Sequence, residues 1–160
     1  MPGLEPYARE AALEFLFNGT TSIHIALLSV LPEEGTGEVE IGPTGYARIP
    51  ETVWTTEPSD ATAATIRANG STINFGPYGE SVTVRGWAAY DALAGGNLLA
   101  SGIFVGLGSG DPLEVAIPAG NDIQFQPGNI AIGISSDSGV CDITSGGWSF
   151  PWSSPWSGGG

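Results

Sequence analysis

The stretch SVTVRGWAAYDALAGGNLLASGIFV, residues 81–105, decides the fold of this chain. β-Branched and aromatic residues flank a short run rich in Gly and Asn, which is the pattern of two strands joined by a turn. Residues 82–90 are predicted to form the first strand and residues 98–105 the second. Residues 91–97 supply the turn, because Gly accepts positive φ angles freely and Asn tolerates them. The hairpin carries no reactive group.

Composition indicates one folded domain made of short elements. The chain has 160 residues, 41% of them hydrophobic, which is enough for one real core. Charged residues make up 13%, about half of the usual share of roughly 25%. With 25 Gly and 12 Pro, the sequence favours many strands separated by turns over long helices.

The charge balance excludes some partners. Four basic residues against 17 carboxylates give a net charge of −13, which repels polyanions. Neither nucleic acid nor an anionic membrane is therefore expected as a partner. The sequence shows no secretory signal and no apolar run long enough to span a membrane. Cys141 is the one cysteine, so we expect no intrachain disulfide.

One helix is predicted near the N-terminus, over residues 4–17. Apolar residues recur there at the spacing of one helical face, which we expect to lie against a sheet or a neighbouring subunit. Phe15 and Phe17 are candidate partner-docking residues. The predicted apolar stripe consists of Leu4, Ala8, Ala11, Ala12, Phe15 and Leu16.

The remainder of the chain up to residue 134 alternates short apolar runs with turn residues. Residues 21–30 form a predicted strand in which Ile23, Ile25 and Leu27 face one way and His24, Ala26 and Leu28 the other. Residues 56–64 are predicted to form a loop. Short strands bounded by Gly, Pro and Asn are typical of an antiparallel sandwich or barrel. Further strands are expected at 45–54, 66–69, 71–75, 113–117, 123–125 and 130–134.

The predicted fold class is therefore all-β: an antiparallel β-sandwich, jelly-roll-like, with one N-terminal helix and an extended C-terminal arm. We expect residues 1–20 to hold the helix, residues 21–135 the sandwich, and residues 136–160 the arm. The arm is rich in Ser, Gly and Pro and carries three of the five Trp residues. Its aromatic side chains are candidate docking groups for this domain or for a partner, with a disordered tail as the alternative. These groups are Trp148, Phe150, Trp152 and Trp156.

An acidic loop is predicted between residues 31 and 44. A solvated loop is the preferred interpretation, and a bound cation stays open, because the spacing lacks the pattern of a dedicated calcium loop. The carboxylates concerned are Glu33, Glu34, Glu38 and Glu40.

No catalytic motif was found in the sequence. It contains no nucleophile elbow, zinc-protease, paired-cysteine or phosphate-loop signature, and its single His24 has no metal-ligand partner in a recognisable spacing. We therefore expect no enzyme activity, no catalytic residues, no metal site and no cofactor.

The hairpin resembles the core motif of a family of small tailed-bacteriophage virion proteins, usually labelled tail fibre or minor tail proteins. Tyr90-Asp91-Ala92 followed by Gly95-Gly96-Asn97-Leu98-Leu99 matches the GGNLL-type core, and Gly45-Tyr46-Ala47-Arg48 resembles a second family motif. The resemblance spans about residues 4–134, although Gly79-Glu80 stands where the family often has Trp-Gly. The motif residues expected to be structural are Tyr46, Arg48, Asp91, Gly95, Gly96 and Asn97.

The resemblance implies a non-enzymatic structural subunit of the virion, made in the host cytoplasm and released by lysis. It implies docking on other virion proteins as a homo-oligomer, expected to be a trimer, at a tail fibre or tail tip. Two alternatives stay open. The first is a capsid decoration, or cement, protein that stabilises the head. The second is a carbohydrate-binding module that would stack Trp54, Trp87 or the arm tryptophans on host surface glycan.

Overall fold

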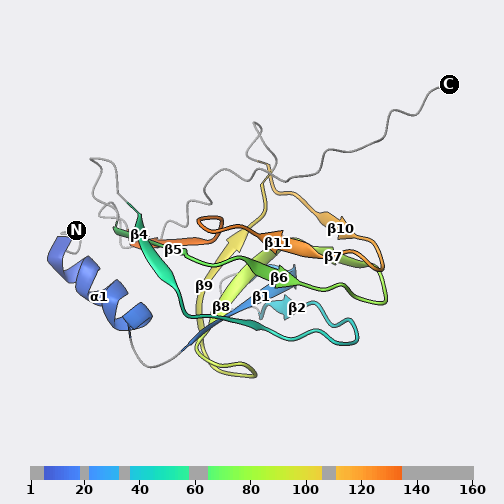
Figure 1. Cartoon of the computed structure of the whole chain (residues 1–160), viewed down its shortest axis with the longest axis horizontal. Coiled ribbons are helices and arrows are strands. Elements are labelled where there is room, and N and C mark those ends of the chain that lie inside the picture. Colours follow the sequence, from blue (N-terminus) through green and yellow to red (C-terminus); the bar gives the residue numbers. More distant parts are fainter. Residues whose placement is uncertain (1–5, 19–21, 33–36, 58–64, 106–110, 135–160) are drawn as a thin grey trace.

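The computed structural model describes residues 6–18, 22–32, 37–57, 65–105 and 111–134. These ranges hold one helix, α1 (Pro6–Asn18), and twelve strands, and every strand pair is antiparallel (Figure 1). The helix lies at one end of the molecule, beside β4 and β5. The prediction of an all-β antiparallel sandwich with one N-terminal helix is confirmed. Jelly-roll connectivity and the three-part division of the chain stay predictions.

The predicted hairpin forms one side of the largest sheet, with β8 inside the sheet and β9 at its edge. In that sheet β1 pairs with β8, and β8 pairs with β9 across the turn, with Trp87 opposite Gly102. On its other edge β1 pairs with β2 near its end and with β3 near its start. The strands of this sheet are β1 (Ile23–Val30), β2 (Val39–Glu40), β3 (Ile49–Glu51), β8 (Gly86–Tyr90) and β9 (Leu98–Ile103).

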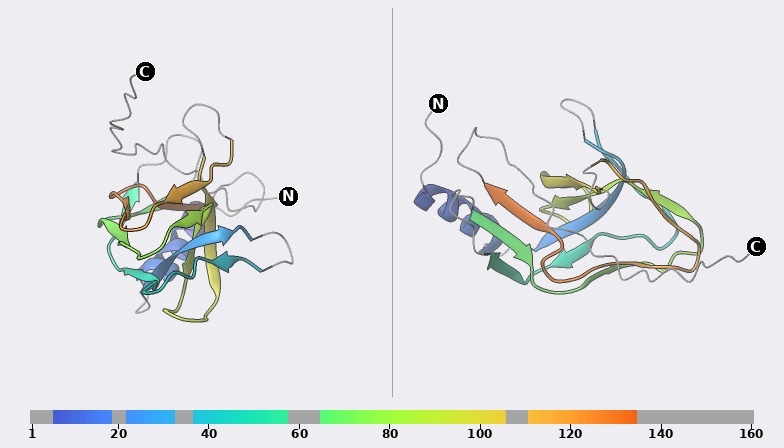
Figure 2. Two further views of the ribbon diagram at one scale, coloured as in Figure 1. Left: turned by 90° about the vertical axis from the view of Figure 1, so that its right-hand side faces the viewer. Right: turned by 90° about the horizontal axis from the view of Figure 1, so that it is seen from above.

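Three smaller sheets complete the described fold. They contain β10 with β7, β11 with β6, and β4 and β12 on either side of β5. The α1 helix packs on β5 and β12, and β12 runs toward the end that carries the helix (Figure 2). The strands are β4 (Trp54–Glu57), β5 (Thr65–Asn69), β6 (Ile73–Phe75), β7 (Val82–Val84), β10 (Val115–Ile117), β11 (Ile123–Phe125) and β12 (Ala131–Ile134).

Alternation along β1 separates two apolar clusters, as the sequence predicts. Ile25 and Leu27 belong to the main core, while Leu28 packs on the opposite face of the sheet in a small cluster with Ala88 and Tyr90. Because both faces are covered, β8 is buried at every position. The main core joins this sheet to β6 and β11 through a set of packed aromatic rings. The largest of its fully buried side chains are Trp87, Phe75, Phe104 and Phe125.

Three strand boundaries differ from the prediction. The first hairpin strand is interrupted at Arg85, because β7 pairs with β10 whereas β8 pairs with β1 and β9. The strand predicted over 45–54 divides into β3 and β4, which belong to different sheets. Residues 56 and 57, predicted to start a loop, belong to β4 instead, and the rest of the predicted loop, residues 58–64, lies outside the described residues. Alternating apolar residues identify a strand locally, but they do not show where the chain changes sheets.

Candidate functional site

Arg48 joins motif residues that are far apart in the sequence. Its side chain is 8% exposed, and its guanidinium donates hydrogen bonds to the carbonyl oxygens of Ala92, at 2.8 Å, and Gly95, at 2.6 Å. These two residues belong to the turn of the central hairpin, 44 and 47 positions further along the chain. Arg48 therefore ties the segment before β3 to the turn between β8 and β9.

The same guanidinium is neutralised by Glu40. Arg48 donates from Nε and Nη2 to one carboxylate oxygen of Glu40, at 3.0 and 2.5 Å, and the hydroxyl of Tyr46 donates to the other oxygen at 2.9 Å. The Tyr46 oxygen in turn accepts the backbone N–H of Leu27 at 3.1 Å. Charge-assisted bonds of this kind are about twice as strong as neutral ones. The cluster therefore connects β1, β2 and the hairpin turn.

Tyr90 closes the cluster from the β8 side. The Arg48 guanidinium lies 3.5 Å from the centre of the Tyr90 ring, a cation–π contact, and the Tyr90 hydroxyl donates to Glu38 at 2.6 Å. The hydrogen bond from Tyr90 lowers the pKa of Glu38, while burial raises the pKa of Tyr90. Burial also raises the pKa of Tyr46. The directions of these shifts fit a hydrogen bond donated by a neutral Tyr90 phenol to an ionised Glu38 carboxylate.

The hairpin turn is held by its own residues as well. The backbone N–H and the side-chain amide of Asn97 donate to the two carboxylate oxygens of Asp91, each at 2.7 Å, and this lowers the pKa of Asp91. Gly95 and Gly96 have φ angles of 63° and 78°, in the region that favours glycine. We give the name arginine cluster to the hydrogen-bonded groups around Arg48 together with the turn that Arg48 holds. Its motif residues are Tyr46, Arg48, Asp91, Gly95, Gly96 and Asn97.

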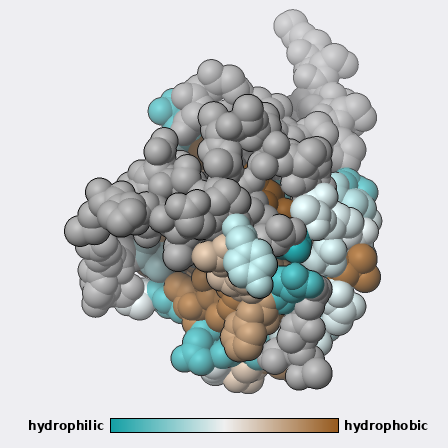
Figure 3. Space-filling model, turned by 90° about the vertical axis from the view of Figure 1, so that its left-hand side faces the viewer, coloured by the Kyte–Doolittle hydropathy of each residue, from teal (hydrophilic) through white to brown (hydrophobic). Residues whose placement is uncertain are grey.

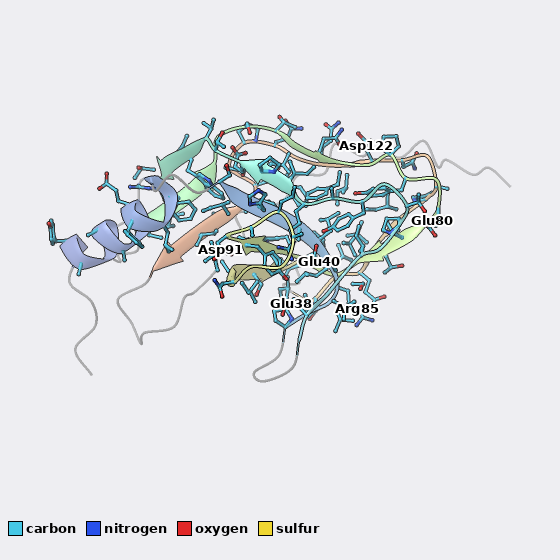
Figure 4. The ribbon with its side chains drawn as sticks, turned by 90° about the horizontal axis from the view of Figure 1, so that it is seen from below. Glu38, Glu40, Glu80, Arg85, Asp91 and Asp122 are labelled. Carbon is cyan, nitrogen blue, oxygen red and sulfur yellow. The ribbon has the colours of Figure 1, made fainter. Side chains whose placement is uncertain are left out.

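The network also takes in Glu38 and Glu40, which the sequence analysis assigned to a solvated loop. That interpretation is wrong for these two residues, because both are partly buried and hydrogen-bonded, whereas Glu33 and Glu34 lie outside the described residues. The alternation of Glu38 and Glu40 with Val39 was a strand signal that could have identified β2. Figure 4 shows Glu38 and Glu40 between Asp91 and Arg85.

Gly95 and Gly96 differ in the space around their Cα atoms, so replacement by Ala should destabilise the protein to different extents. A Cβ at Gly95 would meet nothing within 4 Å, whereas one at Gly96 would meet the Cβ of Ala92 at 2.7 Å and the carboxylate of Asp91. We expect Gly95→Ala to cost about 1 kcal/mol, the backbone penalty alone. Gly96→Ala adds a steric penalty and should cost about 2–3 kcal/mol. Urea denaturation of both variants measures the difference, and equal losses would contradict the packing described.

The α1 helix presents its aromatic residues on two opposite sides. Leu13 is fully buried, and Phe17 packs on Trp54 with ring centroids 4.6 Å apart, so Phe17 belongs to the chain's own core and is not free to dock. Tyr7 and Phe15 are 85% and 83% exposed. The prediction of the buried helix face is therefore wrong: Leu13 and Phe17 face the core, whereas Phe15, a member of the predicted stripe, is exposed. Figure 3, which views the end that carries α1, shows hydrophobic surface gathered there.

The other side chains considered for binding, Trp54, Trp87 and His24, are buried or partly buried in the structure. Trp87 is 1% exposed and cannot stack on a sugar ring, while Trp54 is partly buried against Phe17. Nδ1 of His24 is buried without a hydrogen-bond partner. In the described ranges, no three metal-binding side chains gather and no helix is long and apolar enough to cross a membrane. Four docking candidates lie outside the described residues: Trp148, Phe150, Trp152 and Trp156.

The fold and the arginine cluster define a class of protein: a small antiparallel β domain in which the motif residues stabilise the domain's own loops. A family model described as podophage GP4 fiber I protein gp80 matches residues 3–132. The chain therefore belongs to this family of phage fibre proteins and is a virion component. No curated protein matches it. The expected tail-fibre family is confirmed, while the GGNLL run as its identifying mark stays a prediction.

Proposed function

We propose that this protein is a non-enzymatic, peripheral subunit of the fibre apparatus that docks on other virion proteins as a homo-oligomer, a trimer. The exposed face of α1 carries this proposal. Tyr7, Ala11 and Phe15 recur at a spacing of four residues and are all exposed, so they line one side of the helix. Exposed aromatic residues aligned on one helix face are typical of a protein–protein contact.

The C-terminal arm, residues 136–160, is the second proposed docking element. Tryptophans on a Pro-rich segment provide large contact areas at low cost in conformational entropy. The use of the arginine cluster in internal bonds supports a structural role, since its carboxylates and cation already satisfy one another. A fibre family favours a tail position over the capsid decoration alternative.

Assembly of variant chains tests this role. We expect Phe15→Glu to abolish trimer formation in solution and reduce incorporation into particles by roughly tenfold or more, because it places a charge in a desolvated contact. Leu93→Glu is the matched control, since Leu93 is 57% exposed in the hairpin turn and far from α1 in sequence. Light scattering and the copy number per particle measure the outcome. Normal assembly by the Phe15 variant would refute the helix contact.

Deleting residues 140–160 tests the arm separately. The truncated chain should fold with an unchanged circular dichroism spectrum but assemble poorly. If it failed to fold, the arm would be part of the core instead of a docking element.

A further inference from the structure

Two adjoining hollows lie along β10, on the opposite side of the fold from α1 (Figure 1). The larger has a volume of about 370 Å³ and is lined by residues 113–117 together with Asp122 and Ile123. The smaller, of about 220 Å³, lies between Leu31, Arg85 and residues 112–114. Both are bordered by Leu113 and Glu114, so they form one groove, which we name the β10 groove.

The β10 groove is mainly apolar, with charged residues at its margins. Leu113 is 37% exposed, and Ala116 points outward from β10. Glu114 pairs with Arg85 across the smaller hollow, and Asp122 lies at the far side of the larger one. A volume in the range of ligand pockets with an apolar floor suits a bulky aromatic group. Its acidic margin, on a chain of net charge −13, repels a second acidic surface.

One segment of this chain meets these requirements. Residues 143–160 carry no charged side chain and include three tryptophans, each four residues from the next. They follow Ile134, the last described residue of β12. Trp148 lies 14 positions after Ile134, which is an extended reach of about 46 Å at roughly 3.3 Å per residue. An uncharged, Trp-bearing segment is therefore available in every copy of the protein.

Geometry favours a groove on a neighbouring copy over the chain's own. The end of β12 lies beside Thr65 and close to α1, whereas β10 lies toward the other side of the molecule (Figures 1 and 2). Within one chain the arm would have to run back over the fold. Between copies, an exit at one end and a groove at the other make a head-to-tail contact, which closes into a ring when the rotation between copies permits.

We propose that the β10 groove binds the segment Trp148–Trp156 of a neighbouring copy, with a tryptophan ring in the larger hollow. This proposal rests on the arm being a docking element, as proposed above. The groove and the arm then form one repeated contact around the oligomer, separate from the contact made by the outer face of α1.

Cysteine trapping in the full-length chain tests this contact. In a Cys141→Ser background, one batch carries Ala116→Cys and a second carries Ser153→Cys, and the two are mixed and mildly oxidised. A disulfide needs Cα atoms within about 7 Å, so only a seated arm should link the two positions efficiently. We expect linkage at least about tenfold faster than with Ala94→Cys, an exposed control in the hairpin turn, because docking raises the effective thiol concentration. Mass spectrometry of the linked peptides identifies the pair.

Further outcomes decide between this proposal and its competitors. Adding Trp152→Ala to the Ser153→Cys chain should return the linkage to the control rate. Equal rates at positions 116 and 94 would overturn the proposal. A third chain carries both Ala116→Cys and Ser153→Cys; linkage within single copies of that chain, with no linkage between the two mixed batches, would overturn the proposal in favour of the chain's own arm. If particles contain the chain at normal copy number yet give no 116–153 linkage, the groove assignment fails while the fibre role stands.

Discussion

Replacing Arg48 by Ala is expected to destabilise the protein by about 3 kcal/mol, since the change leaves buried polar groups without partners. Glu40, only 25% exposed, would lose its counter-ion, and the carbonyl oxygens of Ala92 and Gly95 would lose their donor. The Tyr90 ring would also lose its cation–π contact. The denaturation midpoint in urea, with its slope unchanged, measures the loss.

Arg85→Ala is the matched control for this prediction. Arg85 also forms an ion pair, with Glu114, but the two side chains are 48% and 56% exposed. Exposed pairs contribute about 0–1 kcal/mol, so the midpoint should hardly move. A third variant, Arg48→Lys, keeps the charge but not the planar fork of donors, and should recover only part of the loss. Equal midpoints for the two alanine variants would show that the arginine cluster does not hold the hairpin turn.

The hairpin, the helix and most strands could be predicted because their signals are local. Alternating apolar residues and Gly or Asn turns act within about ten residues, and they placed β8, β9 and the turn at 91–97. The arginine cluster could be predicted only as a set of motif residues. The contact between Arg48 and Gly95 spans 47 positions, and nothing in the local pattern shows which distant carbonyls a buried guanidinium will meet.

The helix shows a different limit. Its extent was predicted within about two residues, but its buried face was not, because Ala, Phe and Leu occur on every side of it. Phe17 packs against Trp54 and Leu13 is fully buried, whereas Phe15 stays exposed. Where apolar residues surround a helix, the neighbouring sheet decides which face is buried, and the sequence of the helix alone does not. The exposed face of α1, which carries Tyr7 and Phe15, supports the docking proposal.

The second large effect is expected at Gly86, the first residue of β8, where a side chain would collide with the backbone of β9. Gly86 is buried and lies opposite Ile103, and a Cβ there would collide with the carbonyl oxygen of Gly102 and approach Cδ2 of Leu31 at 2.7 Å. A flexible side chain can move aside, but a backbone oxygen in a paired strand cannot move without separating the strands. We expect Gly86→Ala to cost about 3 kcal/mol, at the upper end of overpacking penalties.

Gly79→Ala provides the control, because a Cβ at Gly79 would meet nothing within 4 Å and its φ needs no glycine. That change should alter stability by less than about 1 kcal/mol, through the unfolded chain alone. Hydrogen exchange then locates the effect: amides of β8 and β9 should lose protection in the Gly86 variant, while those of β5 and β12 keep theirs, since the latter pair in a separate sheet. Uniform loss of protection across all four strands would show that the sheets unfold as one unit and that the close approach is not a local constraint.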